Sequence, residues 1–223
     1  MKQLKRHQDN FNSQLKRIIT ITDSVFAVAL TLLVIDIKLP EIESPTDYIL
    51  WNSLKDLKWT ILGFIISFFI VGYYWSVHHR IFGYVIKYTS RLIWINLMFL
   101  FSVILLPFTS GLLGKFAFNI NLIMPYGLYV FNICLTATMN AILWFYVSNP
   151  KNNLLTYQIS QERILLGFYF TLVVPLLFII SLLIVFINPI VGRLIPIAIP
   201  FVLKYGLIGL TNRAMTKEKE NKI

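Results

Sequence analysis

Cysteine, histidine and charged residues are scarce in this sequence. Of its 223 residues, one is cysteine, three are histidine and 13% are charged, whereas 57% are hydrophobic. Because Cys134 is the only cysteine, no intrachain disulfide is possible, and cysteine usage does not indicate the redox compartment. A soluble domain of this size does not carry so much apolar surface, because water would drive it to aggregate. The composition therefore predicts an integral membrane protein.

The residue groups that catalysis and metal binding require are also missing. No nucleophile is accompanied by a general base and an orienting group, so we expect no enzyme. The adjacent His78 and His79 would point about 100° apart on a helix, so both could rarely bind one ion. His7 lies in the N-terminal arm and Cys134 in the middle of an apolar segment, so neither completes a cluster. We therefore expect no metal and no cofactor.

The formal net charge of +10 does not come from a single basic patch. The basic residues are scattered over the segments that flank apolar runs, which is typical of membrane topology and not of a nucleic-acid surface. No nucleic-acid partner is expected. The first 17 residues are polar for too long to be a signal peptide, and no small-residue cleavage site follows the first apolar segment. We expect that segment to remain in the mature protein.

Six apolar segments approach the roughly 20 residues that a spanning helix needs. They predict an all-α fold with six transmembrane helices per subunit. No loop is long enough for a soluble domain, so residues 1–223 are predicted to form one membrane domain. Prolines interrupt the last segment, which is tolerated where neighbouring helices cover the freed backbone groups. The predicted spans are residues 18–39, 60–77, 92–113, 122–147, 164–187 and 194–210.

Lysine and arginine alternate between successive loops. The N-terminal arm, the second and fourth loops and the C-terminal tail are basic, whereas residues 40–58 are acidic. Basic loops tend to stay in the cytoplasm. The sequence therefore predicts a multi-pass protein of the cell membrane with both termini in the cytoplasm and residues 40–58 outside.

One stripe of the first span mixes small, hydroxyl and branched side chains: Ser24, Val28, Thr31 and Ile35 recur at helical spacing. Such a stripe suits a seam between helices or the wall of a pore. Periodicity alone favours the seam, because seams are the commoner use.

Asp23 lies around the helix from this stripe and is expected to face other helices. A carboxylate in a membrane is costly without partners, so it predicts a polar network. The network either holds a pore helix or anchors a helix at the interface. The candidate partners at similar depth are His78, His79, Arg91, Trp94 and Asn96.

Residues 17–23, RIITITD, resemble the R-x-x-x-F-S-D signature that opens the first helix of the transmembrane protein 175 family of potassium channels. Arg17 and Asp23 match directly. Ile21 stands in place of the aromatic residue, and Thr22 in place of serine keeps the hydroxyl. Residues 23–40 and 73–108 also resemble the family, so the likeness covers about the first half of the chain. The second half matches mainly in hydropathy.

The resemblance implies a concrete assembly. Prokaryotic members have six helices per subunit and form homotetramers, in which the first helix of each subunit lines a central pore without a re-entrant filter loop. Animal members fuse two such repeats and dimerise, and proton conduction has been described for them. With one repeat, this chain is expected to assemble from four copies, with membrane lipids as surroundings and potassium ions as permeating ions.

The family's constriction falls five, eight and twelve residues after the signature aspartate, which gives Val28, Thr31 and Ile35. Together with the periodicity, this favours the pore over the seam. Four Val28 side chains would form a hydrophobic constriction, and four Thr31 hydroxyls would replace water around a cation. Asp36 would concentrate cations at the outer mouth.

The sequence therefore predicts a potassium-preferring channel that conducts passively. The positions that hold the pore helix are predicted to be Arg17, Thr22, Asp23, His78, His79, Arg91, Trp94 and Asn96. The alternatives are a proton-conducting channel, a proton-coupled secondary transporter in which Asp23 and a histidine relay the proton, and a membrane protein without transport. The VGYY stretch at residues 71–74 lacks the second glycine of a TVGYG filter and lies in an apolar helix, so it is predicted not to be one.

Overall fold

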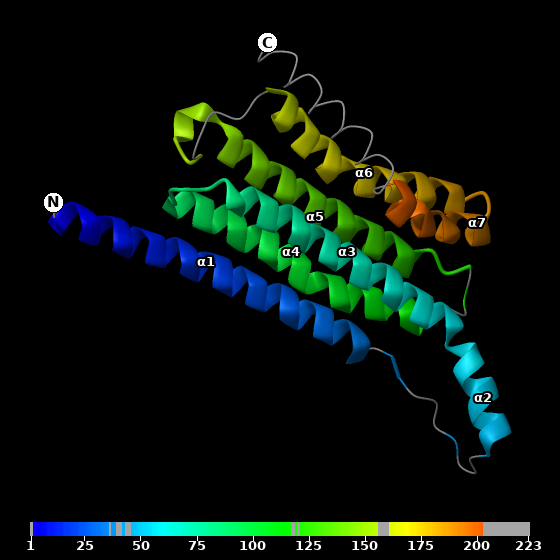
Figure 1. Cartoon of the computed structure of the whole chain (residues 1–223). Coiled ribbons are helices and arrows are strands. Elements are labelled where there is room, and N and C mark those ends of the chain that lie inside the picture. Colours follow the sequence, from blue (N-terminus) through cyan, green and yellow to red (C-terminus); the bar gives the residue numbers. More distant parts are fainter. Residues whose placement is uncertain are drawn as a thin grey trace.

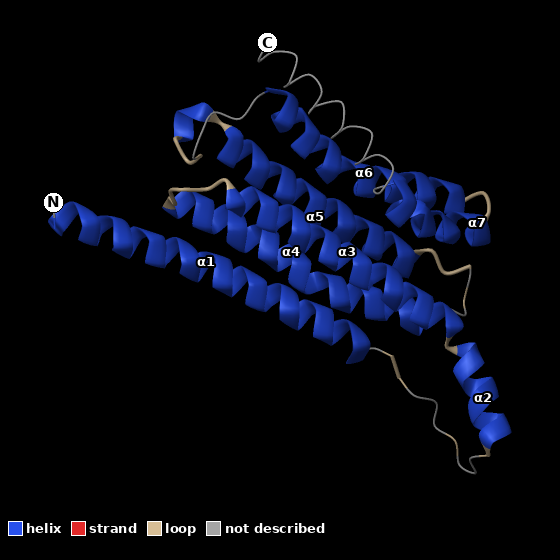
Figure 2. Cartoon of the chain, in the orientation of Figure 1, coloured by secondary structure: helices blue, strands red, loops and turns tan. Residues whose placement is uncertain are grey.

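The structure is a computed structural model in which the described residues are helical apart from turns, short connections and one isolated bridge between Val85 and Leu155 (Figure 2). It describes residues 2–35, 37–38, 42, 46–116, 119, 121–155 and 161–202, and the side chains of all of these except 2–13 and 162. The helices are α1 (Lys2–Ile35), α2 (Asp47–Asp56), α3 (Lys58–Gly83), α4 (Ser90–Lys115), α5 (Met124–Ser148), α6 (Gln161–Val185) and α7 (Pro189–Leu194), with the short 3-10 helices η1 (Pro150–Asn152) and η2 (Ile195–Ala198).

Within the described part of the chain, five helices are long and apolar enough to cross a bilayer: α1 over Gln14–Ile35, α3, α4, α5, and α6 over Arg163–Val185. These correspond to the first five predicted spans. The predicted end of the first span at residue 39 is wrong, because α1 ends at Ile35 and residues 37 and 38 are not helical. For the sixth, the structure shows a shorter apolar helix over Pro189–Val202, and residues 203–210 lie outside the described residues. Six spans therefore stay a prediction.

Helix α2 was not predicted from the sequence, because residues 40–58 were interpreted only as an acidic loop. Its first turn is capped by Thr46, whose hydroxyl oxygen accepts a hydrogen bond from the Ile49 backbone N–H at 3.3 Å. Asp47 lies in that first turn, where a negative charge suits the helix dipole. No residue of α2 is buried, so its sequence lacks the hydrophobic period by which a packed helix is predicted.

Helix α1 lies at one edge of the bundle, where it packs against α3 and α4 (Figure 1). Behind them, α4 packs on α5, α5 on α6, and α6 on α7. The N-terminal part of α1 projects past the end of the other helices, whereas α2 and α7 lie at the opposite end (Figure 1). That opposite end, where α3 begins and α4 ends, is called the α2 end below. The arrangement leaves one long face of α1 without a neighbour among the described residues.

Two glycines permit close helix packing. A Cβ atom on Gly167 of α6 would lie 2.4 Å from Nε1 of Trp144, which donates a hydrogen bond to the Ile164 carbonyl at 3.0 Å. A Cβ atom on Gly192 of α7 would lie 2.6 Å from the backbone nitrogen of Val185. Larger residues at either position would force the helices apart. Gly192 in this way fixes α7 against the end of α6.

Candidate functional site: the uncovered face of the first helix

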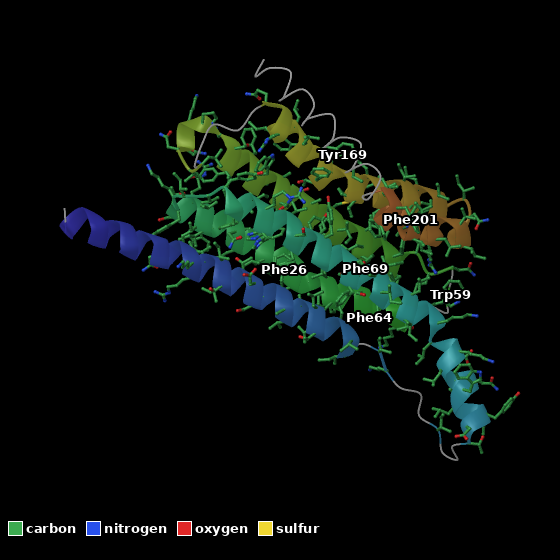
Figure 3. All side chains as sticks on the ribbon, viewed as in Figure 1. Phe26, Trp59, Phe64, Phe69, Tyr169 and Phe201 are labelled. Carbon is green, nitrogen blue, oxygen red and sulfur yellow. The ribbon has the colours of Figure 1, made fainter. Side chains whose placement is uncertain are left out.

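Helix α1 has two opposite faces. Thr22, Phe26, Ala29 and Leu33 are buried, with exposed fractions of 2% or less, and they recur at intervals of four, three and four residues. At 100° per residue this places them on one side of the helix, toward α3 and α4. Phe26 lies on this side, against the rings of Phe99 and His78 (Figure 3).

The stripe predicted from periodicity lies on the other face. Ser24, Val28, Thr31 and Ile35 are all exposed in the single chain, Val28 by 55% and Ile35 by 69%. On a helical wheel the stripe is centred about 160–180° from the buried face. A seam with another described helix of the same chain is thereby excluded. The described residues therefore leave this face free for a contact, or a shared lumen, with a group outside the described bundle.

The hydroxyl groups of this face are turned toward their own helix. Thr31 donates a hydrogen bond to the Val28 carbonyl at 2.8 Å, and Ser24 donates one to the Thr20 carbonyl at 2.8 Å. A hydroxyl that donates in this way keeps oxygen lone pairs with which it accepts. Each oxygen on the face is therefore available as a ligand for a cation or as an acceptor for water.

Behind the exposed stripe, a chain of hydrogen bonds joins α1, α4 and α3. His78 Nε2 donates to Asn96 Oδ1 at 2.7 Å, and Asn96 Nδ2 donates to Thr22 Oγ1 at 3.0 Å. Thr22 in turn donates to the Ile18 carbonyl at 3.0 Å. All three side chains are at least 97% buried. Because unpaired polar groups are costly in such surroundings, the bonds specify how α1 sits on α3 and α4.

Aromatic rings enclose the histidine of this network. The His78 ring is stacked with Phe82 at a centroid distance of 4.4 Å and with Phe99 at 5.3 Å. Phe26 of α1 closes a third side at 6.2 Å. The enclosure fixes the ring plane, so that Nε2 is aimed at Asn96.

Asp23 does not belong to this network, contrary to the sequence prediction. Its Oδ1 accepts a hydrogen bond from Nε1 of Trp75 at 3.0 Å, on the outward side of α3. The Trp75 ring also contacts the exposed His79, at a centroid distance of 5.7 Å. The prediction placed the partners by depth alone, whereas the rotation of α3 decides which residues face α1. Trp75 was not among the predicted partners, so the pair was missed.

Other predicted members of the network have different surroundings. Trp94 is 64% exposed, Arg17 is exposed, and the Arg91 guanidinium lies 5.5 Å from the centre of the Tyr146 ring. Residues adjacent in sequence on α4 point in different directions, so Asn96 faces α1 while Arg91 and Trp94 do not. Asp36, the predicted outer mouth, lies outside the described residues.

The structure agrees with the prediction that the VGYY stretch is not a selectivity filter. Residues 71–74 lie inside α3, and Val71 and Tyr74 are fully buried. Their carbonyls belong to the helix ladder and do not form a filter. His78 and His79 point to different surroundings, and the described residues contain no cluster of three or more metal-binding side chains.

The fold and this face define a multi-pass helical membrane protein whose first helix is locked on one side and uncovered on the other. A sequence profile described as "Endosomal/lysosomal potassium channel TMEM175" matches residues 17–107. A relative named as a potassium channel in Chryseobacterium sp. is 32% identical over 155 residues, which cover 69% of this chain and 78% of that protein. The chain belongs to the TMEM175 family, a family of ion channels and not of enzymes, which needs no cofactor.

Two further comparisons show the extent of the likeness. A protein named as a potassium channel in Streptomyces collinus is 33% identical over 100 residues, or 45% of this chain and 48% of that protein, so the match spans about half of that relative. The crystal structure of a lysosomal potassium-selective channel TMEM175 homolog from Chamaesiphon minutus superposes with a TM-score of 0.72 at 25% identity. It covers 86% of this chain and 98% of that one. The resemblance stated from the signature at residues 17–23 is confirmed.

Proposed function

We propose that the chain is one subunit of a homotetrameric, potassium-preferring cation channel that conducts passively. The observation that carries the proposal is the exposed stripe of Ser24, Val28, Thr31 and Ile35 on a helix whose opposite face is locked to the bundle. The relatives and the solved homolog named as potassium channels support it. The whole chain would then act as one six-helix channel domain.

The polarity of the stripe favours a lumen over lipid. The exposed face of α4 is apolar, with Leu97, Phe101 and Phe108 among its members, and such residues suit acyl chains. The exposed face of α1 instead carries hydroxyl groups at positions 24 and 31 within its spanning segment. Hydroxyl groups gain more from ions and water than from lipid tails.

The chemistry of the proposed pore follows from four copies of this face. The four Val28 side chains would form a hydrophobic constriction, and the Thr31 oxygens one turn further would replace part of the hydration shell of a passing cation. Selectivity would depend on the cost of partial dehydration and on pore width, so it would be modest. Asp36 would concentrate cations at the outer mouth, with both termini in the cytoplasm and the channel in the cell membrane.

The geometry does not favour the alternative of a proton-coupled transporter. Among the described residues, Asp23 bonds to the Trp75 indole, which only donates, and His78 bonds to the Asn96 amide. Neither the indole nor the amide passes a proton on readily. Proton conduction through a water-filled pore remains an outcome of the test below.

The proposal is tested by reversal potentials. We expect purified protein in planar bilayers, with potassium on one side and sodium on the other, to give a current that reverses toward the potassium equilibrium potential. Thr31→Ala should move the reversal potential toward zero, because it removes the oxygens that distinguish the two ions. Silent or anion-selective bilayers would overturn the channel, and a reversal that follows only an imposed pH gradient would assign proton conduction instead.

A second prediction concerns the bond between Asp23 and Trp75, which we propose orients the pore helix without touching ions. Asp23→Ala and Trp75→Phe each remove this bond, which is worth roughly 1 kcal/mol, and should lower the tetramer fraction in size-exclusion chromatography alike. Asp23→Asn keeps an acceptor oxygen and serves as the matched control. The double variant should be no worse than either single one. An altered potassium-to-sodium ratio in intact tetramers would place Asp23 in the pore instead.

A further inference from the structure

A cavity of about 430 Å³ opens at the α2 end of the bundle. None of its described lining residues belongs to α1. Its walls come from the start of α3, the end of α4, the start of α5, α6, α7 and η2, and include Trp59, Gly63, Tyr126, Tyr129, Phe178 and Arg193. Trp59, near the start of α3, marks this end of the bundle (Figure 3). Tryptophan prefers the headgroup level of a bilayer, so the cavity lies near that level.

Arg193 is the only charged side chain among the described residues that line the cavity. Its Nη2 donates to the Leu122 carbonyl at 3.0 Å, and its guanidinium lies 5.9 Å from the centre of the Tyr126 ring. These contacts hold the side chain in place. Its Nε, however, is buried and has no hydrogen-bond partner in the described structure. A buried donor of a charged group without a partner is costly, so the site favours an added anion.

The two tyrosine hydroxyls of the cavity are already paired. The Tyr126 hydroxyl bonds to Ser181, and the Tyr129 hydroxyl bonds to Ser67 at 2.8 Å. The guanidinium is therefore the charged group that discriminates between ligands. The other described walls are mainly apolar, which favours an amphiphile with one anionic group.

A second, apolar groove of about 560 Å³ continues from this cavity. The two share Leu62, Ile66 and Pro196 in their walls. The groove extends along α3 past Phe69 to Tyr73 and is bordered by Phe201, and Figure 3 labels Phe69 and Phe201. The described walls of this groove carry no charged side chain. A cation at headgroup level followed by an apolar channel has the shape of an anionic lipid, with the headgroup first and an acyl chain behind it.

We propose that this site binds one phospholipid with a net negative headgroup. Its phosphate oxygens would accept from the Arg193 guanidinium, and one acyl chain would lie in the groove beside α3. The inference depends on the membrane location of the chain and not on ion conduction, so either one can fail without the other.

The test uses the full-length protein in detergent, titrated with phosphatidylglycerol or phosphatidylcholine and measured by native mass spectrometry. Wild type should retain phosphatidylglycerol preferentially. Arg193→Gln should weaken its retention about tenfold, the loss expected for one charge-assisted bond. Lys115→Gln is the matched control, because it removes one positive charge at the same end from an exposed residue that does not line the cavity, and it should have no effect.

Gly72→Leu tests the acyl chain separately and leaves Arg193 untouched. Gly72 lines the groove and does not line the cavity that holds Arg193. A Cβ atom on Gly72 meets nothing within 4 Å, so a side chain can begin there without a clash and narrow the groove. It should weaken retention of phosphatidylglycerol by a similar factor. Unchanged retention in either Arg193→Gln or Gly72→Leu, or an equal loss in Lys115→Gln, would overturn the site. Absence of bound lipid in wild type would also overturn it.

Discussion

Replacing Val28 with alanine is expected to raise the single-channel conductance about fivefold, because a fall of roughly 1 kcal/mol in the barrier at a constriction has this effect on a rate. Val28 is 55% exposed on the uncovered face of α1. Four copies meeting around an axis would lose eight carbon atoms together, which widens the neck and eases its wetting. The measurement is unitary current in symmetrical potassium.

Val34→Ala is the matched control for Val28→Ala. Val34 is the same residue type on the same helix and is 53% exposed, but it lies about 120° around the helix axis from Val28. Its truncation should leave the unitary current unchanged. A larger unitary current with Val34→Ala and an unchanged one with Val28→Ala would mean that a different face of α1 lines the pore, which would contradict the assignment.

Asn96→Leu is expected to lower the free energy of unfolding by about 1–2 kcal/mol and to alter conduction as well. Asn96 accepts from His78 and donates to Thr22, so its loss leaves the buried imidazole N–H without its acceptor. It also removes the only described side-chain hydrogen bond between α1 and α4, so the rotation of the pore helix should become less well defined. Thermal unfolding in detergent and unitary currents measure the two effects.

Asn140→Leu provides the comparison for Asn96→Leu. Asn140 is equally buried and donates to Thr171 at 3.0 Å, but it joins α5 to α6, away from α1, and its own Oδ1 already lacks a partner. Its replacement should therefore cost less stability and leave conduction unchanged. Equal changes in conduction from both variants would mean that general loosening of the bundle, and not the rotation of α1, controls the pore.

Much of this architecture could be predicted from residue order. Runs of about 20 apolar residues have to be helical in a bilayer, since only a helix satisfies every backbone group within one segment. The first five predicted spans therefore coincide with the observed apolar helices, although their ends differ by up to six residues, as at Gly83 of α3. Helix α2 was missed, because a short exposed helix depends on its cap and not on a hydrophobic period.

The stripe on α1 could also be predicted, because the period of a helix places Ser24, Val28, Thr31 and Ile35 on one face whatever surrounds it. The depth of each residue in the membrane could also be predicted from the sequence. This depth identified His78 and Asn96 as candidate members of the polar network. Depth did not reveal that Thr22, and not Asp23, would meet Asn96.

What the sequence by itself determined is thus the class of protein, the spans, the family signature and the composition of each helical face. What only the tertiary structure decided is the pairing of those faces: Thr22 with Asn96 and His78, Asp23 with Trp75, and Arg193 at the end of an apolar groove. The physical reason is that periodicity and hydropathy are properties of one helix. The rotation of each helix about its axis is set by packing against residues far away in the chain.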